Sequence, residues 1–336
     1  MAIGVNEQVS AALAVAGAET ASPHEKAEML MEIAIGLQIK PKSSEELLAA
    51  VELYDRALEI CPATHALLSA RINARKATAL QSLPESGTAS LEQARDAINI
   101  AIPLIREHGT PEELAESEMN LGLILQSLAG ANKARITDAI AAYQRALRTF
   151  DRTAFPQEYA VLQNNLATAF LSIPFTDERS KMREALAVQA FEEGLRIVNL
   201  IDHPSEYAML QNNLGNALQY ASSSHTLENN VRALEAYDEA LKVRTREITP
   251  REYANTISNK ANCLWNLPDD ASDPDAGNIK NLRTARNLYA EAREIFNQAG
   301  EHEKARIVAE AVDQIERETL SVTLPMRSTA DSHGNH

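Results

Sequence analysis

The chain of 336 residues is poor in the residue types that interrupt helices or support redox chemistry. Glycine occurs 12 times, aromatic residues make up 4% of the sequence, and the two cysteines, Cys61 and Cys263, lie far apart. A chain rich in alanine, leucine and glutamate with so little glycine favours an all-α protein. Two distant cysteines form neither a disulfide framework nor a metal-ligand spacing. They fit a reducing compartment, and we expect a cytoplasmic protein.

Basic residues and long apolar runs are also scarce. The 47 acidic residues outnumber the 32 lysines and arginines, which gives a formal net charge of −15. Nucleic acid and anionic membranes attract clustered positive charge, so we expect neither as a partner. No apolar run approaches the ~20 residues of a membrane span, and the first residues lack the basic region of a signal peptide. The acidity serves solubility or, alternatively, attracts a basic partner.

Motifs for catalysis and for metal binding are missing from the sequence. It contains no glycine-rich phosphate loop, no Gly-x-Ser-x-Gly elbow and no His-Glu-x-x-His zinc motif. The aspartate-rich stretch 269–275 fails the calcium-loop pattern, because Thr284 stands where a bidentate glutamate is needed. We therefore expect no enzyme activity, no cofactor and no metal site.

A repeated unit is what the sequence does contain. A small residue, a ring or aliphatic residue four positions later, and a second small residue three positions after that recur at intervals of 44 to 52 residues. Spacings of four and seven place the three side chains on one stripe of a helix. The triplets are Ala50-Tyr54-Ala57, Ala94-Ile98-Ala101, Ala139-Tyr143-Ala146, Ala187-Phe191-Gly194, Ala233-Tyr237-Ala240 and Ala285-Tyr289-Ala292.

A second pattern precedes the later triplets and opens with a proline. Its apolar and small residues recur as Leu121-Gly122-Leu125, Leu166-Ala167-Phe170 and Leu214-Gly215-Leu218. Each unit is thus expected to be two helices joined by a turn. The small residues allow a neighbouring helix to come close, and the ring fills the gap beside them. Neither helix buries its apolar stripe alone, so the units must stack into a continuous core.

These residues resemble the tetratricopeptide repeat, whose first helix carries Leu-Gly and whose second carries alanine, an aromatic residue and alanine. The motif Tyr-Ala-x-x-Gln-Asn-Asn-Leu-Gly-Asn-Ala-Leu at 207–218 is similar to the longer-period bacterial variety of this repeat. The period of the repeat in this sequence exceeds the usual 34 residues by about ten. The resemblance covers roughly residues 24–296. It implies a right-handed superhelical solenoid of about six helix-turn-helix repeats with a concave surface, and it implies no chemistry.

The repeats predict the domain organisation. An N-terminal arm at 1–22 precedes the repeat array at 23–300, and a capping helix at 301–320 and a disordered tail at 321–336 follow it. The capping helix is amphipathic and has no partner helix, as a terminal cap requires. Within the array the approximate units are 23–61, 62–110, 111–155, 156–203, 204–249 and 250–300.

Asparagines recur on the first helices and are the strongest candidates for a functional site. One column contains Asn120, Asn165, Asn213 and Asn259, and flanking positions carry Asn164, Asn212, Asn216 and Asn262. In the resembled family this face lines the inside of the superhelix, where an amide both donates to and accepts from a peptide backbone. The main column either clamps an extended partner or ties one repeat to the next. The flanking amides are expected to point further into the groove, where the partner's side chains are read by Met209, Gln219, Tyr220, Trp265 and Asn266.

Two other features of this face leave alternatives open. Members of the resembled family hold a carboxylate with lysine and arginine here, but salt bridges to acidic neighbours are the commoner fate of such residues. The residues concerned are Arg71, Arg75, Lys76 and Lys260. Trp265, the single tryptophan, is expected either in the groove as a binding hot spot or in the seam against the long loop at 267–281.

The favoured function is a non-enzymatic scaffold for protein–protein interaction, an adaptor or assembly factor that binds an extended partner segment in the asparagine-lined groove. The alternative is a regulatory repeat module that acts on a separately encoded enzyme or signalling effector. An enzyme with a cryptic site in the groove is the least favoured hypothesis.

Overall fold

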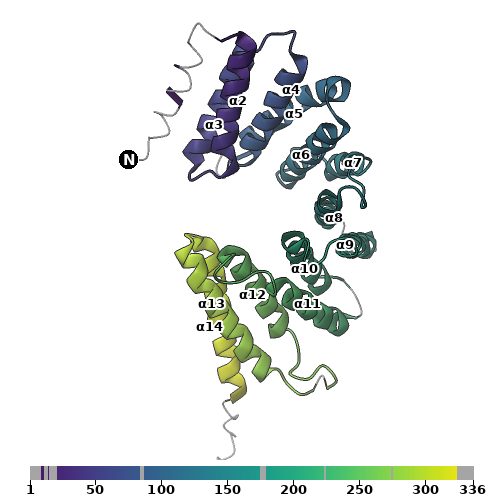
Figure 1. Cartoon of the computed structure of the whole chain (residues 1–336). Helices are drawn as coiled ribbons and strands as arrows, with labels where there is room; N and C mark the ends of the chain where they lie inside the picture. Colours follow the sequence, from purple (N-terminus) through teal and green to yellow (C-terminus); the bar gives the residue numbers. More distant parts are fainter. Residues whose placement is uncertain are drawn as a thin grey trace, which may run out of the picture. The chain divides into compact units, whose positions relative to one another are not determined.

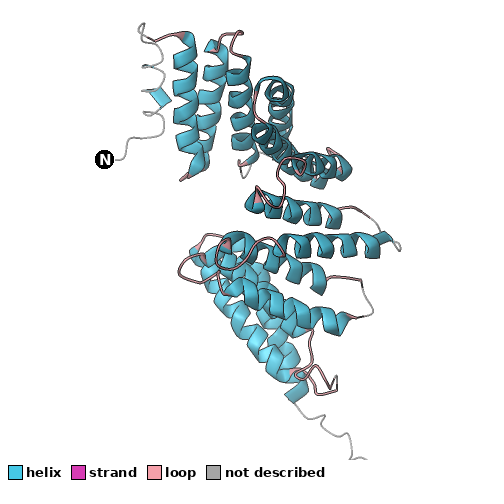
Figure 2. Ribbon diagram, turned by 45° about the vertical axis from the view of Figure 1, so that its right-hand side comes forward, coloured by secondary structure: helices cyan, strands magenta, loops and turns pink. Residues whose placement is uncertain are grey.

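The structure is a computed structural model that describes residues 9, 10, 14, 21–83, 87–174, 179–222, 225–273 and 275–323. Its regular elements are all helices, and the described residues contain no strand beyond one isolated bridge between Asp270 and Asp273 (Figures 1 and 2). The chain divides into two compact units, Met1–Phe175 and Thr176–His336.

The first unit is built from helix pairs in chain order. Helix α2 packs on α3, α4 on α5 and α6 on α7, and each second helix also packs on the next first helix. The first helices α2, α4, α6 and α8 are successive neighbours as well. The bounds are α2 Pro23–Ile39, α3 Ser44–Ile60, α4 Ala66–Gln81, α5 Gly87–His108, α6 Pro111–Gly130, α7 Ile136–Ala146 and α8 Pro156–Leu171.

The second unit repeats this arrangement. Helix α10 pairs with α11 and α12 with α13, while α9 packs on α10, α11 on α12 and α13 on α14. The first helices α10 and α12 are again neighbours. The bounds are α9 Arg179–Leu195, α10 Pro204–Gln219, α11 Thr226–Leu241, α12 Pro250–Trp265, α13 Ile279–Gln298 and α14 His302–Thr323. The expected class, an all-α array of stacked helix pairs, is therefore confirmed within each unit.

The predicted boundaries compare with the structure as follows. The predicted capping helix corresponds to α14, which packs on α13 and extends three residues further, to Thr323. Most of the predicted arm and the remainder of the predicted tail lie outside the described residues. The unit division falls between α8 and α9, the two helices assigned to one repeat at 156–203, so that pairing stays a prediction.

In the pairs α6/α7 and α10/α11 a buried tyrosine ring packs against a glycine of the first helix. Tyr143 and Tyr237 are fully buried. A Cβ atom added to Gly122 would lie 2.3 Å from the nearest carbon of the Tyr143 ring, and one added to Gly215 would lie 2.6 Å from the Tyr237 ring. The expected close approach, with a ring filling the gap beside a small residue, is confirmed at both positions.

Each fully buried tyrosine carries a hydroxyl that needs a hydrogen-bond partner inside the protein. The Tyr54 hydroxyl donates to Gln38 Oε1 at 2.7 Å, and Tyr143 donates to Gln126 Oε1 at 2.8 Å. Each glutamine amide in turn donates to a threonine one repeat further on, Gln38 to Thr78 at 2.6 Å and Gln126 to Thr168 at 3.2 Å. This Tyr–Gln–Thr relay joins the two helices of one pair and links that pair to the next.

A buried ion cluster adds a second polar link in the first unit. Glu118 of α6 is 3% exposed and receives Arg106 of α5 at 3.3 Å and Arg145 of α7 at 2.7 Å. Because the carboxylate faces two guanidinium groups, its burial is compensated by charge and hydrogen bonds.

The glycine–tyrosine contact predicts a specific loss of stability. Replacing Gly215 with alanine drives a Cβ into the buried Tyr237 ring, and overpacking of this kind destabilises by about 1–3 kcal/mol, partly offset by the better helix propensity of alanine. Urea unfolding should show a lower free energy of unfolding. The matched control is Gly36→Ala in α2, where a Cβ meets nothing within 4 Å. That control should be neutral or stabilising, and equal effects of the two changes would contradict the packing argument.

The buried hydroxyls and thiol predict a loss of stability at high pH. Burial raises the pKa of Tyr54, Tyr143, Tyr237 and Tyr289 well above 10, and that of Cys263 to about 12. The unfolded chain ionises these groups first. The contribution of the thiol is therefore complete below pH ~7.5 and falls above pH ~8.5, whereas that of the hydroxyls is complete below pH ~9 and falls above pH ~10, by up to ~1.4 kcal/mol per pH unit for each group. Urea midpoints between pH 8 and 11 should show this fall, and Tyr237→Phe should flatten it. A flat profile would contradict the burial of these groups.

Candidate functional site

The first-helix face of the second unit carries most of the predicted site residues, and the structure divides them into buried and accessible groups. Asn212 is 7% exposed, although it was expected to point further into the groove; in the first unit Asn164, expected to do the same, is 8% exposed. That prediction is wrong for both. Each amide lies on the buried stripe of its helix, four residues after a buried alanine, Ala160 or Ala208.

Hydrogen bonds of these amides run to other asparagines. Asn164 Nδ2 donates to Asn165 Oδ1 at 3.2 Å, and in the next first helix Asn212 Nδ2 donates to Asn213 Oδ1 at 3.0 Å. Asn259 Nδ2 of α12 donates to Asn212 Oδ1 of α10 at 3.2 Å. This last bond ties successive first helices together and supports, for this pair, the alternative in which the column is structural.

Two other predicted residues serve the relay of the second unit. The Tyr237 hydroxyl contacts Asn216 Oδ1 at 2.8 Å and Gln219 Oε1 at 2.9 Å. Both side chains remain half-buried. Gln219 thus occupies the place of Gln38 and Gln126 in the first unit, and its hydrogen bond to the buried tyrosine accounts for it without a partner.

The most accessible predicted residues form what we term the tyrosine–amide patch, consisting of Tyr220, Asn262 and Asn266. Tyr220 follows α10 and is 68% exposed. Asn262 of α12 donates to its hydroxyl at 2.6 Å, and exposed Asn266 donates to the Asn262 carbonyl at 2.8 Å. The patch spans two successive first helices. It presents an aromatic ring beside amides that hold free hydrogen-bonding capacity.

Trp265 lies in a seam between helices. Its Nε1 donates to Glu318 of α14 at 2.8 Å, and its ring meets Tyr289 of α13 edge-on at a centroid distance of 6.5 Å. Its carbonyl accepts from Asn278 in the long loop at 3.4 Å. These contacts support the seam alternative for the indole. Its half-buried ring still borders an open groove that also contains Asn266 and Pro268.

Three predicted site residues are half-buried or buried without forming part of the patch. Met209 and Asn213 of α10 are half-buried. Asn165 is 7% exposed, and its Nδ2 has no partner. Their part in partner binding stays a prediction.

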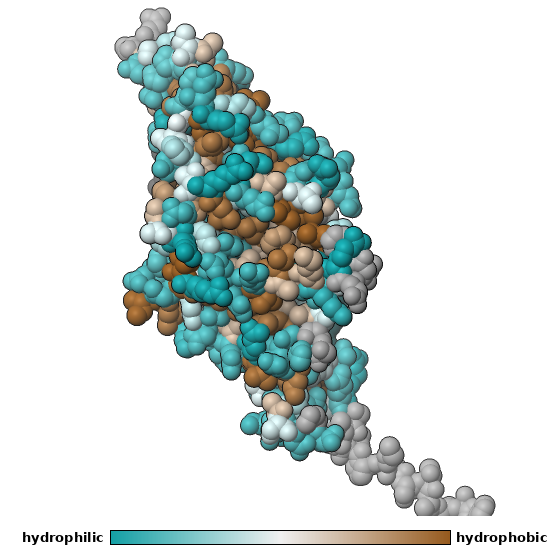
Figure 3. Space-filling model, turned by 90° about the vertical axis from the view of Figure 1, so that its right-hand side faces the viewer, coloured by the Kyte–Doolittle hydropathy of each residue, from teal (hydrophilic) through white to brown (hydrophobic). Residues whose placement is uncertain are grey.

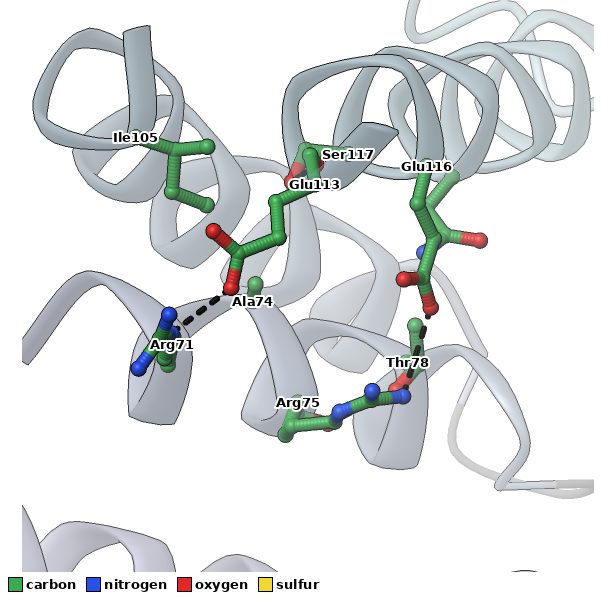
Figure 4. Close-up of a pocket in the computed structure, with 9 residues that line it drawn as sticks. Arg71, Ala74, Arg75, Thr78, Ile105, Glu113, Glu116 and Ser117 are labelled. Carbon is green, nitrogen blue, oxygen red and sulfur yellow. Dashed lines mark hydrogen bonds and ion pairs between the residues drawn. The ribbon is translucent and has the colours of Figure 1, made fainter. Parts of the chain in front are cut away.

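The basic residues of the first unit are engaged by acidic neighbours (Figure 4). Arg71 Nε of α4 contacts Glu113 of α6 at 2.7 Å, and Arg75 contacts Glu116 of α6 at 3.3 Å. Both pairs border a small cleft of ≈ 50 Å³ that Asn120 also lines. Burial raises the pKa of Glu113, but hydrogen bonds from Arg71 and the Thr110 amide outweigh it, so the pKa falls below its ordinary value.

The two lysines of this face are paired in the same manner. Lys76 bonds Asp55, and Lys260 bonds Asp238. Each aspartate directly follows a buried tyrosine of the preceding second helix, so the same inter-repeat contact occurs once in each unit. The salt-bridge alternative is therefore confirmed for all four basic residues.

Asp269 of the long loop hydrogen-bonds to backbone amides and is not part of a cation site in the portion of the chain that the structure describes. Asp269 accepts from the backbone amides of Lys280 at 2.9 Å and Asn281 at 2.7 Å, which caps the start of α13. Among the described residues, no group of three or more His, Cys, Asp or Glu is placed to hold a metal ion. Across that same set, no helix combines the length and apolarity needed to cross a membrane.

Sequence reasoning missed two buried polar residues that matter for the second unit. Glu184 of α9 is 9% exposed and Asn230 of α11 is 4% exposed. Both stand three positions before the first small residue of their triplet. The equivalent positions of the other repeats are apolar, which is a signal that the sequence contained: Leu47, Leu91, Ile136 and Leu282.

Comparison with known proteins places the fold but not the function. No family model matches the chain, and no curated protein matches it. Among solved structures it is similar to a signal transduction ATPase with numerous domains from Pyrococcus horikoshii that carries a tetratricopeptide repeat sensor. The TM-score is 0.57 at 13% identity, over 90% of this chain and 42% of that one, so the chain spans less than half of that protein.

Two other solved structures align over most of their length with lower TM-scores. BtubC from P. vanneervenii has a TM-score of 0.41 at 15% identity, over 99% of both chains. A Rap protein complexed with competence and sporulation factor has a TM-score of 0.40 at 13% identity, over 94% of this chain and 87% of that one. The similarity to the ATPase supports a helical-repeat fold, and scores near 0.4 add nothing to it.

The buried asparagine tie predicts a stability effect that separates structural from binding amides. Asn212→Ala removes the acceptor of Asn259 and should lower the free energy of unfolding by about 1–3 kcal/mol. The matched control is Asn297→Ala at an exposed position of α13, which should change it by less than ~0.5 kcal/mol. Urea unfolding monitored by circular dichroism measures both. An unchanged free energy of unfolding in Asn212→Ala would contradict the structural role of this amide and favour a role in binding.

Proposed function

We propose that the chain is a non-enzymatic scaffold of the tetratricopeptide type that holds an extended segment of a protein partner against its first-helix face. The observation that carries this proposal is the tyrosine–amide patch. It places an exposed aromatic ring and two amides across α10 and α12, and exposed tyrosine is a residue type enriched in binding hot spots.

The geometry of the array suits an extended partner. First helices pack side by side in each unit, so equivalent positions recur along their shared face and present hydrogen-bonding groups in a row. Asparagine amides pair with the N–H and C=O groups of a peptide whatever its side chains. The partner segment is therefore expected to be read through its backbone, with Tyr220 supplying apolar contact.

The largest pKa shifts among the described residues have a structural cause. The largest upward pKa shifts belong to core tyrosines and to Cys263, and burial is their leading cause. Cys263 is fully buried with its Sγ 3.2 Å from the Asn230 carbonyl, and a thiol with its pKa raised to about 12 is a poor nucleophile. Each shift has a structural explanation that requires no reaction.

Apolar side chains also reach the surface outside the tyrosine–amide patch, among them Ile201 and Ile248, which are 87% and 77% exposed. Figure 3 shows broad apolar areas between hydrophilic side chains on the face that it draws. The net charge of the chain, −15, favours solubility. We prefer the tyrosine–amide patch as the candidate because hydrogen bonds hold its ring and amides side by side across two first helices.

The test compares two triple-alanine variants as baits. The patch variant changes Tyr220, Asn262 and Asn266. Affinity purification from the native cell extract with quantitative mass spectrometry should recover a partner with the wild-type protein and lose most of it with the patch variant, and the purified partner should bind the variant at least tenfold more weakly.

The control bait changes Asn287, Asn297 and Gln298, three exposed residues of α13. It should recover the partner as the wild type does. Circular dichroism checks that both baits are folded. Equal recovery by the patch variant and the wild type would refute the proposed face.

A regulatory module remains the second candidate, and one comparison favours it. The ATPase similar to this chain is described as carrying a tetratricopeptide repeat sensor alongside its other domains. An enzyme would then be the partner. Recovery of one enzyme in a fixed ratio, with a turnover that changes when the chain is added, would select this function over that of a passive scaffold.

A further inference from the structure

One position of the second helices breaks the apolar core in two successive repeats. It stands three residues before the first small residue of each triplet, where four repeats have leucine or isoleucine. Glu184 and Asn230 take this position in α9 and α11 and are 9% and 4% exposed. A buried polar side chain in a core position needs hydrogen-bond partners, or it destabilises the fold.

Glu184 has such partners in the following repeat. Its carboxylate accepts from the Ser222 backbone N–H at 2.7 Å and from the Ser222 hydroxyl at 3.1 Å. Ser222 lies just beyond the end of α10. The chain itself therefore supplies the donor to this carboxylate, and both residues line an open groove of ≈ 610 Å³ between α9 and α10.

Asn230 lacks that donor. The residue of the next repeat equivalent to Ser222 is Pro268, because both stand three positions after the aligned Gln219 and Trp265. Proline has no backbone N–H, and Asn230 Oδ1 is buried without a hydrogen-bond partner. The repeat thus keeps the polar acceptor of its predecessor and has lost the group that would satisfy it.

An open groove of ≈ 670 Å³ lies at this mismatch. Its walls combine apolar surface from Leu227, Leu267 and Pro268 with the indole of Trp265, and Asn230 lines it. The terminal amide torsion of asparagine is broad, so a small rotation presents Oδ1 to the groove. The α11 N-terminus, which contributes Thr226 and Leu227, adds partial positive charge beside it.

We propose that this groove binds a short apolar peptide segment whose backbone N–H donates to Asn230 Oδ1. The donor takes the place that the Ser222 N–H holds against Glu184 in the preceding repeat, and the apolar side chain of the segment packs against Trp265 and Pro268. The site is distinct from the tyrosine–amide patch, although Asn266 borders both. It stands whether or not the proposed function of that patch is correct.

The single tryptophan lines the groove and reports on its occupancy. The full-length chain is titrated with N-acetyl-leucine N-methylamide, which has two backbone N–H donors, and with the methyl ester of O-acetyl-2-hydroxy-4-methylpentanoic acid, in which an ester oxygen replaces each N–H. Trp265 fluorescence should change saturably with the amide in the millimolar range, and the ester should bind roughly tenfold more weakly, the loss expected for one hydrogen bond to a buried acceptor. No saturable change, or equal affinities for the two probes, overturns the proposal.

Asn230→Leu tests the residue itself. Leucine occupies this position in three other repeats, so the variant should fold with an equal or higher urea midpoint while losing the discrimination between amide and ester. The matched control Asn297→Leu, at an exposed site near the other end of α13, should keep it. Discrimination that survives in Asn230→Leu assigns the binding to another donor and refutes the role of Asn230. Should the variant fail to fold, the wild-type comparison of the two probes decides alone.

Discussion

The contact between a buried ring and a small residue of the paired helix determines how closely the helices approach. Where Gly122 and Gly215 meet Tyr143 and Tyr237, even one additional methyl group has no room. An aromatic ring is large and nearly rigid, so its position sets the separation and register of the two helices. The spacing of these two helix pairs therefore depends on this one contact.

Using tyrosine for the ring creates a polar requirement in the core, and the polar network follows from it. A buried hydroxyl without a partner is destabilising. Gln38 and Gln126 accept from Tyr54 and Tyr143, and their remaining amide hydrogens reach the next repeat. The relay therefore transmits the geometry of one helix pair to the next. Several amides that look like ligands in the sequence, such as Gln219, belong to this network.

The sequence predicts the pairing of helices better than it predicts the orientation of individual side chains. Helix pairs follow from spacing alone, because residues four and seven apart must share a face. The orientation of Asn164 and Asn212 does not, since adjacent helix positions differ by about 100° and either asparagine of a pair is compatible with the pattern. The Glu118 cluster needs three helices to be in place before its partners can be named, and no local pattern carries that information.

The position shared by Glu184 and Asn230 shows where comparison among repeats adds to periodicity. A single repeat offers no reason to suspect either residue, whereas six aligned repeats reveal two polar substitutions in a leucine position. The structure then separates them, because Ser222 satisfies Glu184 while Pro268 cannot satisfy Asn230. Leucine at 230 would avoid an orphaned acceptor, as it does in other repeats. Local inconsistency of this kind is expected where a site is maintained at the expense of stability, and the groove beside Asn230 provides the space for what such a site would bind.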